Sequence, residues 1–597
     1  MDKEILTQLN KNQFAAVTHT TGPSIILAGA GSGKTRVLTY KVLYLIEEMK
    51  VDPSRIAMMT FTNKAAQEMK ARVKIDLGFT GTFHSLGAKL LRHQAHYAGL
   101  DFNFVIYDED DAESLIKQIM KANPPKVLRK ITPKSVKYRI SGAKDNLLSP
   151  AQLKSFADDE YSVYMAQLYG EYQRRLEKNN AVDFDDLIFK IITMCREHEQ
   201  IKKKYAEMFD YVLVDEFQDT NAGQYAMAKY LAGDKANITV VGDFAQSIYS
   251  WRGADIKNLS RFEEDFDDVK VFQLEQNYRS TQNVLNFAYD VIVENGSHPV
   301  LKLFTDNEDG EEVSVLQLMN EEQEAVFIAE EIRKKLHNHE YDDFAVLYRM
   351  NAQSRVIEEV FLHYGIPYVL IGGTRFYERK EIKDILSYVR LTVNPDDEVA
   401  QERAIKIGKT RYKKLQVFLA TLQDVTETLS TERLIEKILE ETEYMGLYDP
   451  DDPEDGPRLE NIKELRSVAQ QFSDVNNFLE QIALVESEYS ENERHKKGKH
   501  GVKMMTMHQA KGLEFPYVFI VGLEEGILPH SRAIFDKQEL EEERRLLYVG
   551  ITRAKEKLYL TYAERRRMFG RSGYTQVSRF IQEKVPGFSE SISDDTF

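Results

Sequence analysis

Cysteine is almost absent from this chain of 597 residues, which contains only Cys195. A single cysteine excludes an internal disulfide and any zinc site built from several thiolates. No apolar run approaches the roughly 18 residues that a membrane-spanning helix needs, and residues 1–4 lack the basic and then apolar pattern of a secretion signal. We therefore expect a cytoplasmic protein that does not associate with a membrane.

Positive charge is also scarce, since 79 Lys and Arg stand against 96 Asp and Glu, giving a net charge of −17. This total argues against nucleic acid as a partner, but such binding depends on local patches rather than on the sum. One stretch, residues 126–144, carries only cations among its charged residues: Lys126, Arg129, Lys130, Lys134, Lys137, Arg139 and Lys144. The stretch is either an ordinary solvated surface or a surface for phosphates, and composition leaves both open.

The segment AGAGSGKT (residues 28–35) is the most informative feature of the chain. It follows an apolar run at residues 24–27, which predicts a short buried strand, and precedes a segment at 36–43 that predicts a helix. A strand, a glycine-rich turn and Gly-Lys-Thr opening a helix form the phosphate-binding loop, or P-loop. Its backbone N–H groups and the helix N-terminus favour phosphate oxygens. We expect Lys34 to reach the β- and γ-phosphates and Thr35 to bind Mg²⁺.

An acidic pair provides the second half of a nucleotide site. Residues 211–214 are typical of a buried strand, and Asp215 and Glu216 follow it directly. Ligands of open α/β sheets bind at the carboxyl ends of the strands. We expect Asp215 to bind Mg²⁺, mostly through water, and Glu216 to act as the general base on the attacking water.

A third predicted strand, residues 238–243, leads into a segment rich in aromatic side chains. Gln246 follows the strand end, where it would face the γ-phosphate. Tyr249, Trp251 and Arg252 lie within four residues, and Trp251 is the only tryptophan of the chain. These side chains either pack in a core or form a platform on which bases stack. The polar and glycine residues around them favour the platform.

In this order, the motifs resemble those of the UvrD/PcrA/Rep group of superfamily 1 DNA helicases over nearly the full length of the chain. The matching segments are LNKNQ (9–13), AGAGSGKT (28–35), TFTNKAA (60–66), GTFHS (81–85), VDFDDL (182–187), VDEFQDTN (214–221), GDFAQSIYSWRG (242–253), QNYRS (276–280), MTMHQAKGLEF (505–515) and YVGITRA (548–554). So many motifs in the same order leave almost no room for coincidence.

The resemblance implies ATP and Mg²⁺ as cofactors. By this resemblance Gln13 reads the adenine edge, Tyr278 stacks on the base and Glu514 contacts the ribose, while Arg279 and Arg553 act as arginine fingers on the γ-phosphate. The implied nucleotide-binding residues are Gln13, Ala28, Gly29, Ala30, Gly31, Ser32, Gly33, Lys34, Thr35, Arg36, Tyr278 and Glu514. The implied catalytic residues are Lys34, Asp215, Glu216, Gln246, Arg279 and Arg553, and the metal ligands are Thr35 and Asp215.

The resemblance also implies contacts with single-stranded DNA. The implied residues are Phe61, Asn63, His84, Phe184, Tyr249, Trp251, Arg252, Thr506 and His508. For each of these residues the alternative is packing or helix capping, since aromatic side chains fill cores readily. Gln246 is implied to couple the state of the γ-phosphate to the DNA groove.

The spacing of the motifs predicts inserted segments, because Lys34 and Asp215 lie far apart for one compact nucleotide-binding domain. We expect an α/β fold with two RecA-like P-loop motor domains, each interrupted by a mainly helical insertion. The expected boundaries are 1–104 and 186–270 for motor domain 1A, 105–185 for insertion 1B, 271–380 and 502–597 for motor domain 2A, and 381–501 for insertion 2B. A second α/β unit is expected to begin near residues 269–272.

Two departures from the family pattern concern insertion 2B. It is short for the family, and residues 406–409 are Lys-Ile-Gly-Lys where an Arg-Gly-Ile-Gly hairpin is expected. Both put duplex gripping in doubt.

The leading interpretation is an ATP-dependent helicase that moves 3′ to 5′ on single-stranded DNA. We expect it to unwind duplex DNA from single-strand/duplex junctions in repair or replication restart, as a monomer in isolation. The alternative is a DNA-stimulated translocase that displaces proteins from single strands and unwinds weakly. A helicase–nuclease subunit is disfavoured because no nuclease-sized segment follows the last motif. The intact catalytic residues argue against a non-catalytic binding module, while RNA as substrate stays open.

Overall fold

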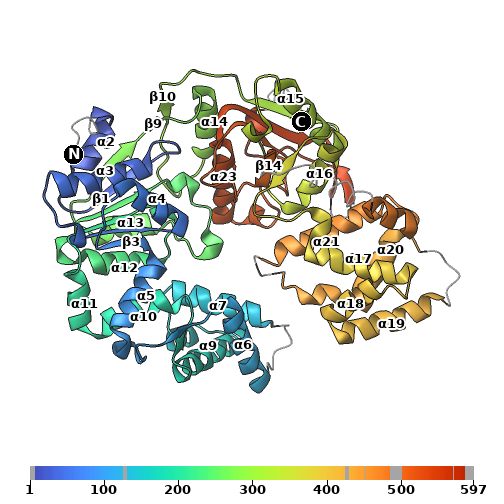
Figure 1. Ribbon diagram of the computed structural model, residues 1–597, viewed down its shortest axis with the longest axis horizontal. Helices are drawn as coiled ribbons and strands as arrows, with labels where there is room; N and C mark the ends of the chain where they lie inside the picture. Colours follow the sequence, from blue (N-terminus) through green and yellow to red (C-terminus); the bar gives the residue numbers. More distant parts are fainter. Residues whose placement is uncertain are drawn as a thin grey trace, which may run out of the picture. The chain divides into compact units, whose positions relative to one another are not determined.

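The structure is a computed structural model that describes residues 7–124, 131–423, 429–450, 452, 454–483, 500–568 and 571–584. The chain divides into two compact units (Figure 1). The first contains Met1–Arg279 and Asn295–Asn307, and the second contains Ser280–Glu294 and Glu308–Phe597. Among the described residues, no helix combines the length and the apolar character needed to cross a bilayer.

The first unit is built on a parallel six-stranded sheet with the order β3-β2-β6-β7-β1-β8. The strands are β1 (Ser24–Ala28), β2 (Ile56–Thr60), β3 (Phe79–Thr82), β6 (Tyr211–Val214), β7 (Ile238–Gly242) and β8 (Lys270–Leu274). Every residue of β1, β2 and β7 is buried. A parallel strand covered on both faces has a nearly continuous apolar sequence, which is why these segments were predictable as strands.

Helices cover both faces of this sheet and carry its two cores. Helices α2 (Lys11–Thr18), α3 (Lys34–Glu47) and α4 (Asn63–Val73) share one core with Ile26 and Leu213. The opposite core contains the neighbouring residues Ile25 and Val212. It also takes side chains from α5 (Phe83–His93), α10 (Asp186–Glu197), α11 (Glu199–Ala206), α12 (Ala222–Ala232) and α13 (Asn258–Asp265). Alternate residues of each strand therefore serve opposite faces, as the twofold periodicity of a strand requires.

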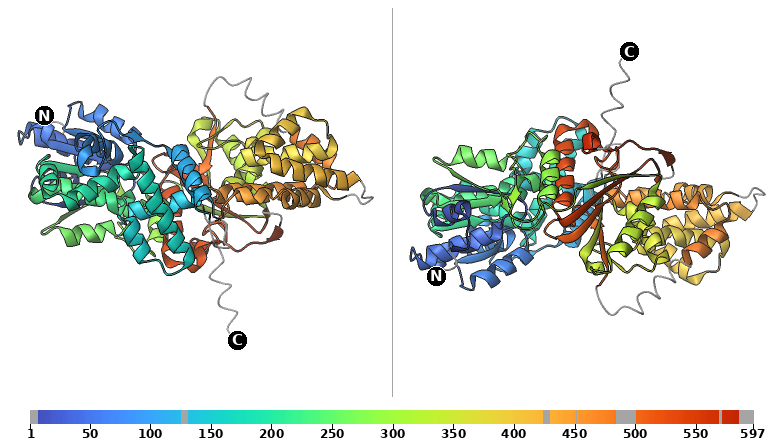
Figure 2. Two further views of the ribbon diagram at one scale, coloured as in Figure 1. Left: turned by 90° about the horizontal axis from the view of Figure 1, so that it is seen from below. Right: turned by 90° about the horizontal axis from the view of Figure 1, so that it is seen from above.

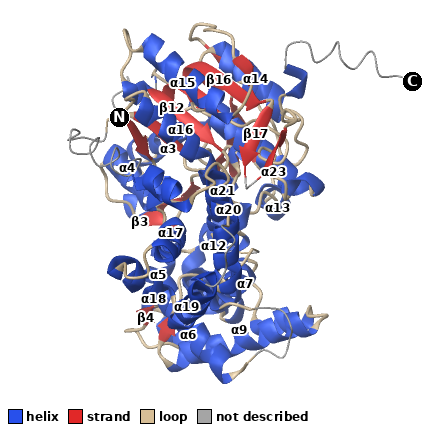
Figure 3. Cartoon of the chain, turned by 90° about the vertical axis from the view of Figure 1, so that its right-hand side faces the viewer, coloured by secondary structure: helices blue, strands red, loops and turns tan. Residues whose placement is uncertain are grey.

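A mainly helical insertion interrupts this unit between β3 and β6, as predicted for the fold class. The short strands β4 (Val105–Ile106) and β5 (Ala181–Val182) pair in parallel at its entry and exit. Between them lie α6 (Glu109–Ala122), α7 (Pro133–Asp145), α8 (Pro150–Ser155) and α9 (Glu160–Lys178), which share a separate apolar core. In Figure 3 the insertion is drawn almost wholly as helix.

One cation of the basic stretch at residues 126–144 is not at the surface. Its first three cations lie outside the described residues, and its last, Lys144, is buried. The Lys144 ammonium lies 2.6 Å from Asp183 and 2.9 Å from Asp186, at the start of α10. A surface role for Lys144 was therefore wrong, because its charge neutralises two buried carboxylates that are distant in sequence.

Replacing Lys144 by methionine is expected to lower the free energy of unfolding of the first unit by about 3–5 kcal/mol. The substitution keeps the apolar stem but leaves the carboxylates of Asp183 and Asp186 buried without their cation. Trp251, the only tryptophan, lies in this unit, so its fluorescence during urea denaturation provides the measurement. The exposed Lys70, replaced in the same way, is the control. Equal midpoints for the two variants would contradict the pairing.

The second unit holds another parallel six-stranded sheet, ordered β11-β16-β15-β12-β14-β13. The strands are β11 (Ser314–Leu318), β12 (Phe344–Tyr348), β13 (Tyr368–Leu370), β14 (Val502–Thr506), β15 (Phe515–Ile520) and β16 (Ala554–Ala563). The unit also contains the helices α14 (Gln282–Ile292), α15 (Glu321–Lys335), α16 (Ser354–His363) and α23 (Lys537–Ile551), and the antiparallel hairpin β17 (Arg565–Met568) and β18 (Arg571–Tyr574). The predicted strands near residues 315, 346, 519 and 559 are confirmed.

A helical insertion also interrupts the second sheet, between β13 and β14. Its helices are α17 (Lys380–Val393), α18 (Glu398–Ile407), α19 (Lys409–Gln423), α20 (Thr431–Glu441) and α21 (Gly456–Ala469), which pack around one core. The views of Figure 2 show them as a bundle, coloured yellow to orange. Gly408 alone separates α18 from α19, at the position of the Lys-Ile-Gly-Lys segment.

The expected start of the second α/β unit was wrong. Strand β8, which contains Val271 and Phe272, pairs with β1 along its whole length and is therefore the edge strand of the first sheet. The first unit also keeps a two-stranded ribbon of β9 (Gln276–Asn277) and β10 (Phe304–Thr305). A strand pattern specifies that a segment is extended but not which sheet it joins, since pairing partners are distant in sequence.

Candidate nucleotide site and nucleic-acid interface

The P-loop joins β1 to α3 in the conformation that phosphate binding needs. Gly31 and Gly33 adopt left-handed backbone angles, with φ of +65° and +85°. A β-carbon on Gly31 would lie 2.7 Å from the side-chain nitrogen Nδ2 of Asn277, so a larger residue does not fit there. Gly33 is the N-cap of α3 and provides no capping side chain. The first backbone N–H groups of α3 therefore remain for an anion.

Thr35 and Asp215 come together at the carboxyl ends of β1 and β6. The Thr35 hydroxyl donates to Asp215 Oδ2 across 3.5 Å. Burial, together with the adjacent Glu216 carboxylate, raises the pKa of Asp215 to about 7. A hydroxyl and a carboxylate are the oxygen ligands that Mg²⁺ prefers, so this pair fits the ion. No cluster of three or more His, Cys, Asp or Glu side chains suited to a metal occurs in the described part of the chain, and Mg²⁺ commonly keeps several waters instead.

Glu216 has a backbone conformation that is unusual for its residue type, with φ of +54°. Its carboxylate accepts a hydrogen bond of 2.6 Å from Gln218 Nε2. Left-handed non-glycine residues cost free energy and cluster at functional sites. The side chain of the expected general base is thus hydrogen-bonded to Gln218, beside Asp215, the predicted Mg²⁺ ligand.

Asp243 connects two predicted site residues, although sequence reasoning gave it no role. It follows β7, the neighbour of β1 in the sheet. Its Oδ2 lies 4.0 Å from Lys34 Nζ and accepts a hydrogen bond of 2.6 Å from Gln246 Nε2. Gln218, the second residue without a predicted role, accepts from the Asp243 backbone N–H at 3.1 Å. Their signal in the sequence was their position after β6 and β7, at the strand ends where ligands bind.

Gln13 lies beside the P-loop, and its side chain forms hydrogen bonds with backbone groups of the protein. Its side-chain amide is buried and donates to the Ser32 carbonyl at 3.0 Å, while its oxygen accepts from the Asn10 backbone. Asn10 in turn donates to the Tyr278 hydroxyl at 3.0 Å. The Tyr278 backbone N–H donates to the Gly31 carbonyl, and its ring is half exposed. The two residues implied for adenine are therefore brought to the same loop.

Arg279 and Arg36 are the remaining arginines of this unit that were predicted for the nucleotide site. A β-carbon on Gly31 would lie 2.9 Å from Arg279 Cβ, which places Arg279 at the loop. Its backbone N–H donates to Asn277 Oδ1 at 2.7 Å. Arg36 instead donates to Gln8 and lies over the Tyr40 ring.

The predicted DNA contacts of the first unit form two aromatic clusters. Phe61 and Tyr249 stack with nearly parallel rings, 6.1 Å between centroids. Trp251 meets Tyr249 edge-on, and the Arg252 guanidinium lies 4.6 Å from the centre of the Trp251 ring. We call Phe61, Tyr249, Trp251 and Arg252 the aromatic platform.

The second cluster pairs His84 with Phe184, whose rings stack at 4.2 Å. Burial lowers the pKa of His84 to about 4, so its imidazole is neutral at physiological pH. Phe184 is 56% exposed, which a core residue is not. Asn63, the first residue of α4, is also exposed.

The second unit holds the other predicted residues. The Arg553 guanidinium is buried and donates to the carbonyls of Val549 and Leu513, at 2.9 and 3.2 Å. Glu514 pairs with Lys555 at 2.8 Å. Both predicted residues therefore lie around one backbone turn, where β15 begins beside β16.

The two predicted DNA contacts of this unit follow β14. Thr506 ends the strand, and its hydroxyl donates to Gln509 Oε1 at 3.1 Å. His508 lies in the turn that follows. For Thr506 the capping alternative is thus realised by a local hydrogen bond, which leaves its role towards DNA a prediction.

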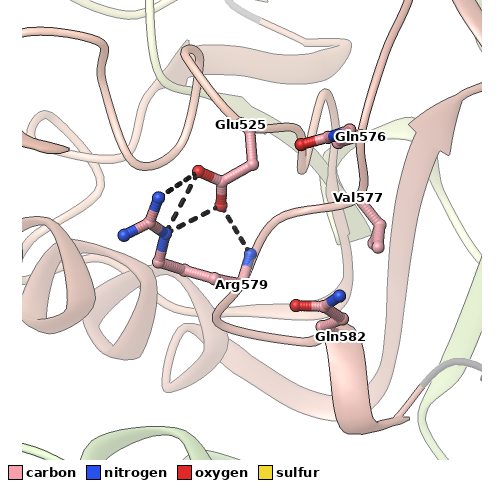
Figure 4. A pocket seen from close by; sticks show the side chains of 5 residues that line it. All are labelled: Glu525, Gln576, Val577, Arg579 and Gln582. Atoms are coloured by element: carbon pink, nitrogen blue, oxygen red, sulfur yellow. Dashed lines mark hydrogen bonds and ion pairs between the residues drawn. The ribbon is translucent and has the colours of Figure 1, made fainter. Parts of the chain in front are cut away.

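A pocket of about 560 Å³ in the second unit contains none of the predicted residues. Figure 4 shows its lining, Glu525, Gln576, Val577, Arg579 and Gln582. Arg579 bonds both oxygens of Glu525, at 2.7 to 3.1 Å. The charged groups of this pocket thus satisfy each other, and we assign it no part in the nucleotide site.

A P-loop opposite an acidic pair, at the carboxyl edge of a parallel sheet flanked by helices, defines a P-loop nucleotide hydrolase with RecA-like motor domains. Residues 9–267 match the UvrD/REP helicase N-terminal domain, and residues 272–419 and 408–565 match the UvrD-like helicase C-terminal domain. The chain therefore belongs to the UvrD/REP helicase family, which confirms the resemblance seen in the motifs.

Several bacterial relatives are similar over nearly the whole chain. The ATP-dependent DNA helicase PcrA of Bacillus subtilis strain 168 is 40% identical over 653 aligned positions, covering 100% of this chain and 88% of the relative. The protein of the same name from Staphylococcus aureus strain Mu50 is 40% identical, covering 99% and 88%. The first alignment has more positions than the 597 residues of the chain, so this relative contains segments that the chain lacks.

Proposed function

We propose that this chain is an ATP-dependent DNA helicase that moves 3′ to 5′ on single-stranded DNA. It would use ATP with Mg²⁺, act at single-strand/duplex junctions in repair or replication restart, and work in the cytoplasm as a monomer in isolation. One observation carries the proposal. The loop after β7 begins with Asp243, which lies 4.0 Å from Lys34 and accepts a hydrogen bond from Gln246, and it ends in the aromatic platform. A nucleotide site and a base-stacking surface thus share one short segment.

The geometry supports hydrolysis by residues in defined positions. The P-loop backbone and Lys34 hold the phosphates, and bound Mg²⁺ would supply charge neutralisation at Thr35 and Asp215. Glu216, fixed by Gln218, accepts the proton of the attacking water. Gln246 bonds Asp243 in this structure, and it is the residue through which a γ-phosphate would alter the loop that leads to Trp251.

The domain boundaries are part of the proposal. Motor domain 1A would comprise residues 1–104 and 186–270 with the remainder of β8, and 105–185 would form insertion 1B. Motor domain 2A would start after Arg279, where the chain passes from the first unit to the second, would leave Asn295–Asn307 to the first unit and would include 502–597, with 381–501 as insertion 2B. Arg553 belongs to the second unit and Lys34 to the first, so a finger role for Arg553 makes hydrolysis depend on both units.

ATP turnover measured with and without oligo(dT) tests this proposal. We expect the rate to rise about tenfold or more with saturating oligo(dT), within the 5- to 150-fold range that is typical of coupling between two ligand sites. A rate that oligo(dT) leaves unchanged would contradict a DNA-driven motor.

Trp251→Ala is expected to weaken single-stranded DNA affinity by about 1–3 kcal/mol, because one stacked base loses its aromatic partner. Fluorescence anisotropy of labelled oligo(dT) provides the measurement. Phe102→Ala removes an aromatic ring of the same unit that is 78% exposed and serves as the control. An unchanged affinity for Trp251→Ala would assign this ring to packing.

A translocase that displaces proteins and unwinds weakly is the second candidate. Two observations favour it. The Bacillus subtilis relative contains segments that this chain lacks, and the Lys-Ile-Gly-Lys sequence lies where only Gly408 separates α18 from α19. Displacement of streptavidin from 3′-biotinylated and 5′-biotinylated oligo(dT) measures movement without unwinding. Displacement together with intact duplexes would favour this candidate over the helicase.

A further inference from the structure

Asp145, the last residue of α7, lies between two segments: the turn that begins at Glu216, which we call the acidic-pair turn, and the aromatic platform. Its Oδ1 accepts a hydrogen bond of 2.6 Å from Asn221 Nδ2. Its Oδ2 faces Gly253, where an added β-carbon would lie only 2.5 Å away. One carboxyl group of the helical insertion therefore contacts both segments.

Both contacts lead to the proposed sites within a few residues. Asn221 is the N-cap of α12 and follows the turn that begins at Glu216. Gly253 directly follows Trp251 and Arg252, and its φ of +85° together with the close Asp145 oxygen requires glycine there. A shift of Asp145 would thus displace the residues at the end of the platform and at the end of the acidic-pair turn.

Asn258 fastens the same two segments to each other. Its side-chain N–H donates to the carbonyls of Thr220 and Asn221, at 2.9 and 3.2 Å. The Asp255 backbone N–H also donates to the Thr220 carbonyl at 3.0 Å. The segment after the aromatic platform is therefore hydrogen-bonded to the segment after the acidic pair. Asp145 of the insertion contacts both segments, at Asn221 and at Gly253.

Asp145 follows a residue whose side chain is buried and ion-paired. The preceding residue, Lys144, is fully buried against Asp183 and Asp186 at the start of α10, and Tyr172 of α9 donates to Asp183. Phe184, the exposed ring of the second aromatic cluster, lies between these two carboxylates in sequence. The end of α7 is thus anchored to the segment that carries another predicted DNA contact.

A role in simple packing does not account for the choice of a carboxyl group. Burial and the nearby Asp185 carboxylate raise the pKa of Asp145 to about 8. A carboxyl group in such surroundings costs free energy that an amide or a small apolar residue would avoid. Its oxygens are the groups that meet Asn221 and Gly253, so the position uses the carboxyl geometry.

We propose that Asp145 is a positioning residue that holds the aromatic platform in register with the acidic-pair turn, so that DNA binding raises ATP turnover. This inference rests on the proposed function. Asp145 contacts neither nucleotide nor DNA in this account and acts through Asn221 and Gly253. It predicts that loss of both side-chain oxygens, as in Asp145→Ala, uncouples DNA from hydrolysis and leaves hydrolysis without DNA intact.

ATP turnover of Asp145→Ala, titrated with oligo(dT), tests the inference. We expect the oligo(dT) concentration for half-maximal stimulation to rise, or the stimulated kcat to fall, by about five- to twentyfold, within the range of typical coupling between sites. The KM for ATP and the rate without DNA stay within about twofold. Asp145→Asn keeps an oxygen for Asn221 and restores most of the stimulation, which a general loss of stability would not do.

Asn221→Ser approaches the same contact from the other side. Serine is a good N-cap, so α12 keeps its cap, but the shorter side chain has no N–H group to reach Asp145. We expect the same loss of stimulation, and no further loss when it is combined with Asp145→Ala. Asp158→Ala, at an exposed aspartate of the same insertion, is the matched control and keeps wild-type stimulation.

The outcomes separate the inference from the proposed function. If oligo(dT) stimulates the wild type and Asp145→Ala alike, the inference is overturned and the motor remains. An equal loss of turnover with and without DNA in Asp145→Ala also overturns it, since the residue would then support the fold alone. If the wild type shows no stimulation, the proposed function fails and the inference with it.

Discussion

Lys34→Ala is expected to lower ATP turnover by about 10²- to 10³-fold, the usual effect of removing one preorganised charge from a transition state. The ammonium lies at the start of α3, at the predicted phosphate-binding loop and 4.0 Å from Asp243. Single-stranded DNA affinity is expected to stay within about twofold, because the platform rings contact each other and Arg252 rather than Lys34.

Stopped ATPase assays and oligo(dT) anisotropy on the same preparation measure the two effects. Lys70→Ala, at an exposed lysine of α4, is the control for removing one positive charge from the unit. A variant that loses DNA affinity along with turnover would refute the separation between the nucleotide site and the platform.

Arg553→Ala is expected to lower DNA-stimulated kcat by about 10³- to 10⁵-fold if the residue is an arginine finger. Its KM for ATP is expected to change much less, because a finger acts on charge that develops in the transition state. In the structure the guanidinium bonds backbone carbonyls of Val549 and Leu513, so it is held beside the turn that carries Glu514.

Steady-state kinetics with saturating oligo(dT) separate kcat from KM, and circular dichroism shows whether the variant keeps its fold. Arg333→Ala removes an exposed arginine of α15 in the same unit and is the control. A folded Arg553→Ala enzyme with nearly normal kcat would confine Arg553 to the structural hydrogen bonds described above.

Local pattern was sufficient to predict the elements that carry the nucleotide site. The strand before the P-loop and the strand before Asp215 are apolar because both faces of the sheet are covered, and each leads directly into predicted site residues. The conformation of the P-loop was also predictable, because glycines between a strand and a helix indicate a tight turn with left-handed backbone angles.

Long-range partners were not predictable from local pattern. Nothing in the sequence around Lys144 shows that its charge meets Asp183, 39 residues later, and Asp186 beyond it. A buried, ion-paired lysine therefore could not be told from a surface lysine. The edge strand β8 was assigned to the wrong sheet for the same reason. Asp243 had no predicted role because its proximity to Lys34 arises only from the pairing of β7 with β1, which local sequence does not reveal.

The most direct test of the central claim is strand displacement, with ATP and Mg²⁺, of matched duplexes that carry a 3′ or a 5′ single-stranded tail. Lys34→Ala serves as the inactive control. The account predicts that the wild type unwinds the 3′-tailed duplex and leaves the 5′-tailed duplex intact. Unwinding of the 5′-tailed duplex alone, or of neither duplex, would contradict a 3′ to 5′ helicase.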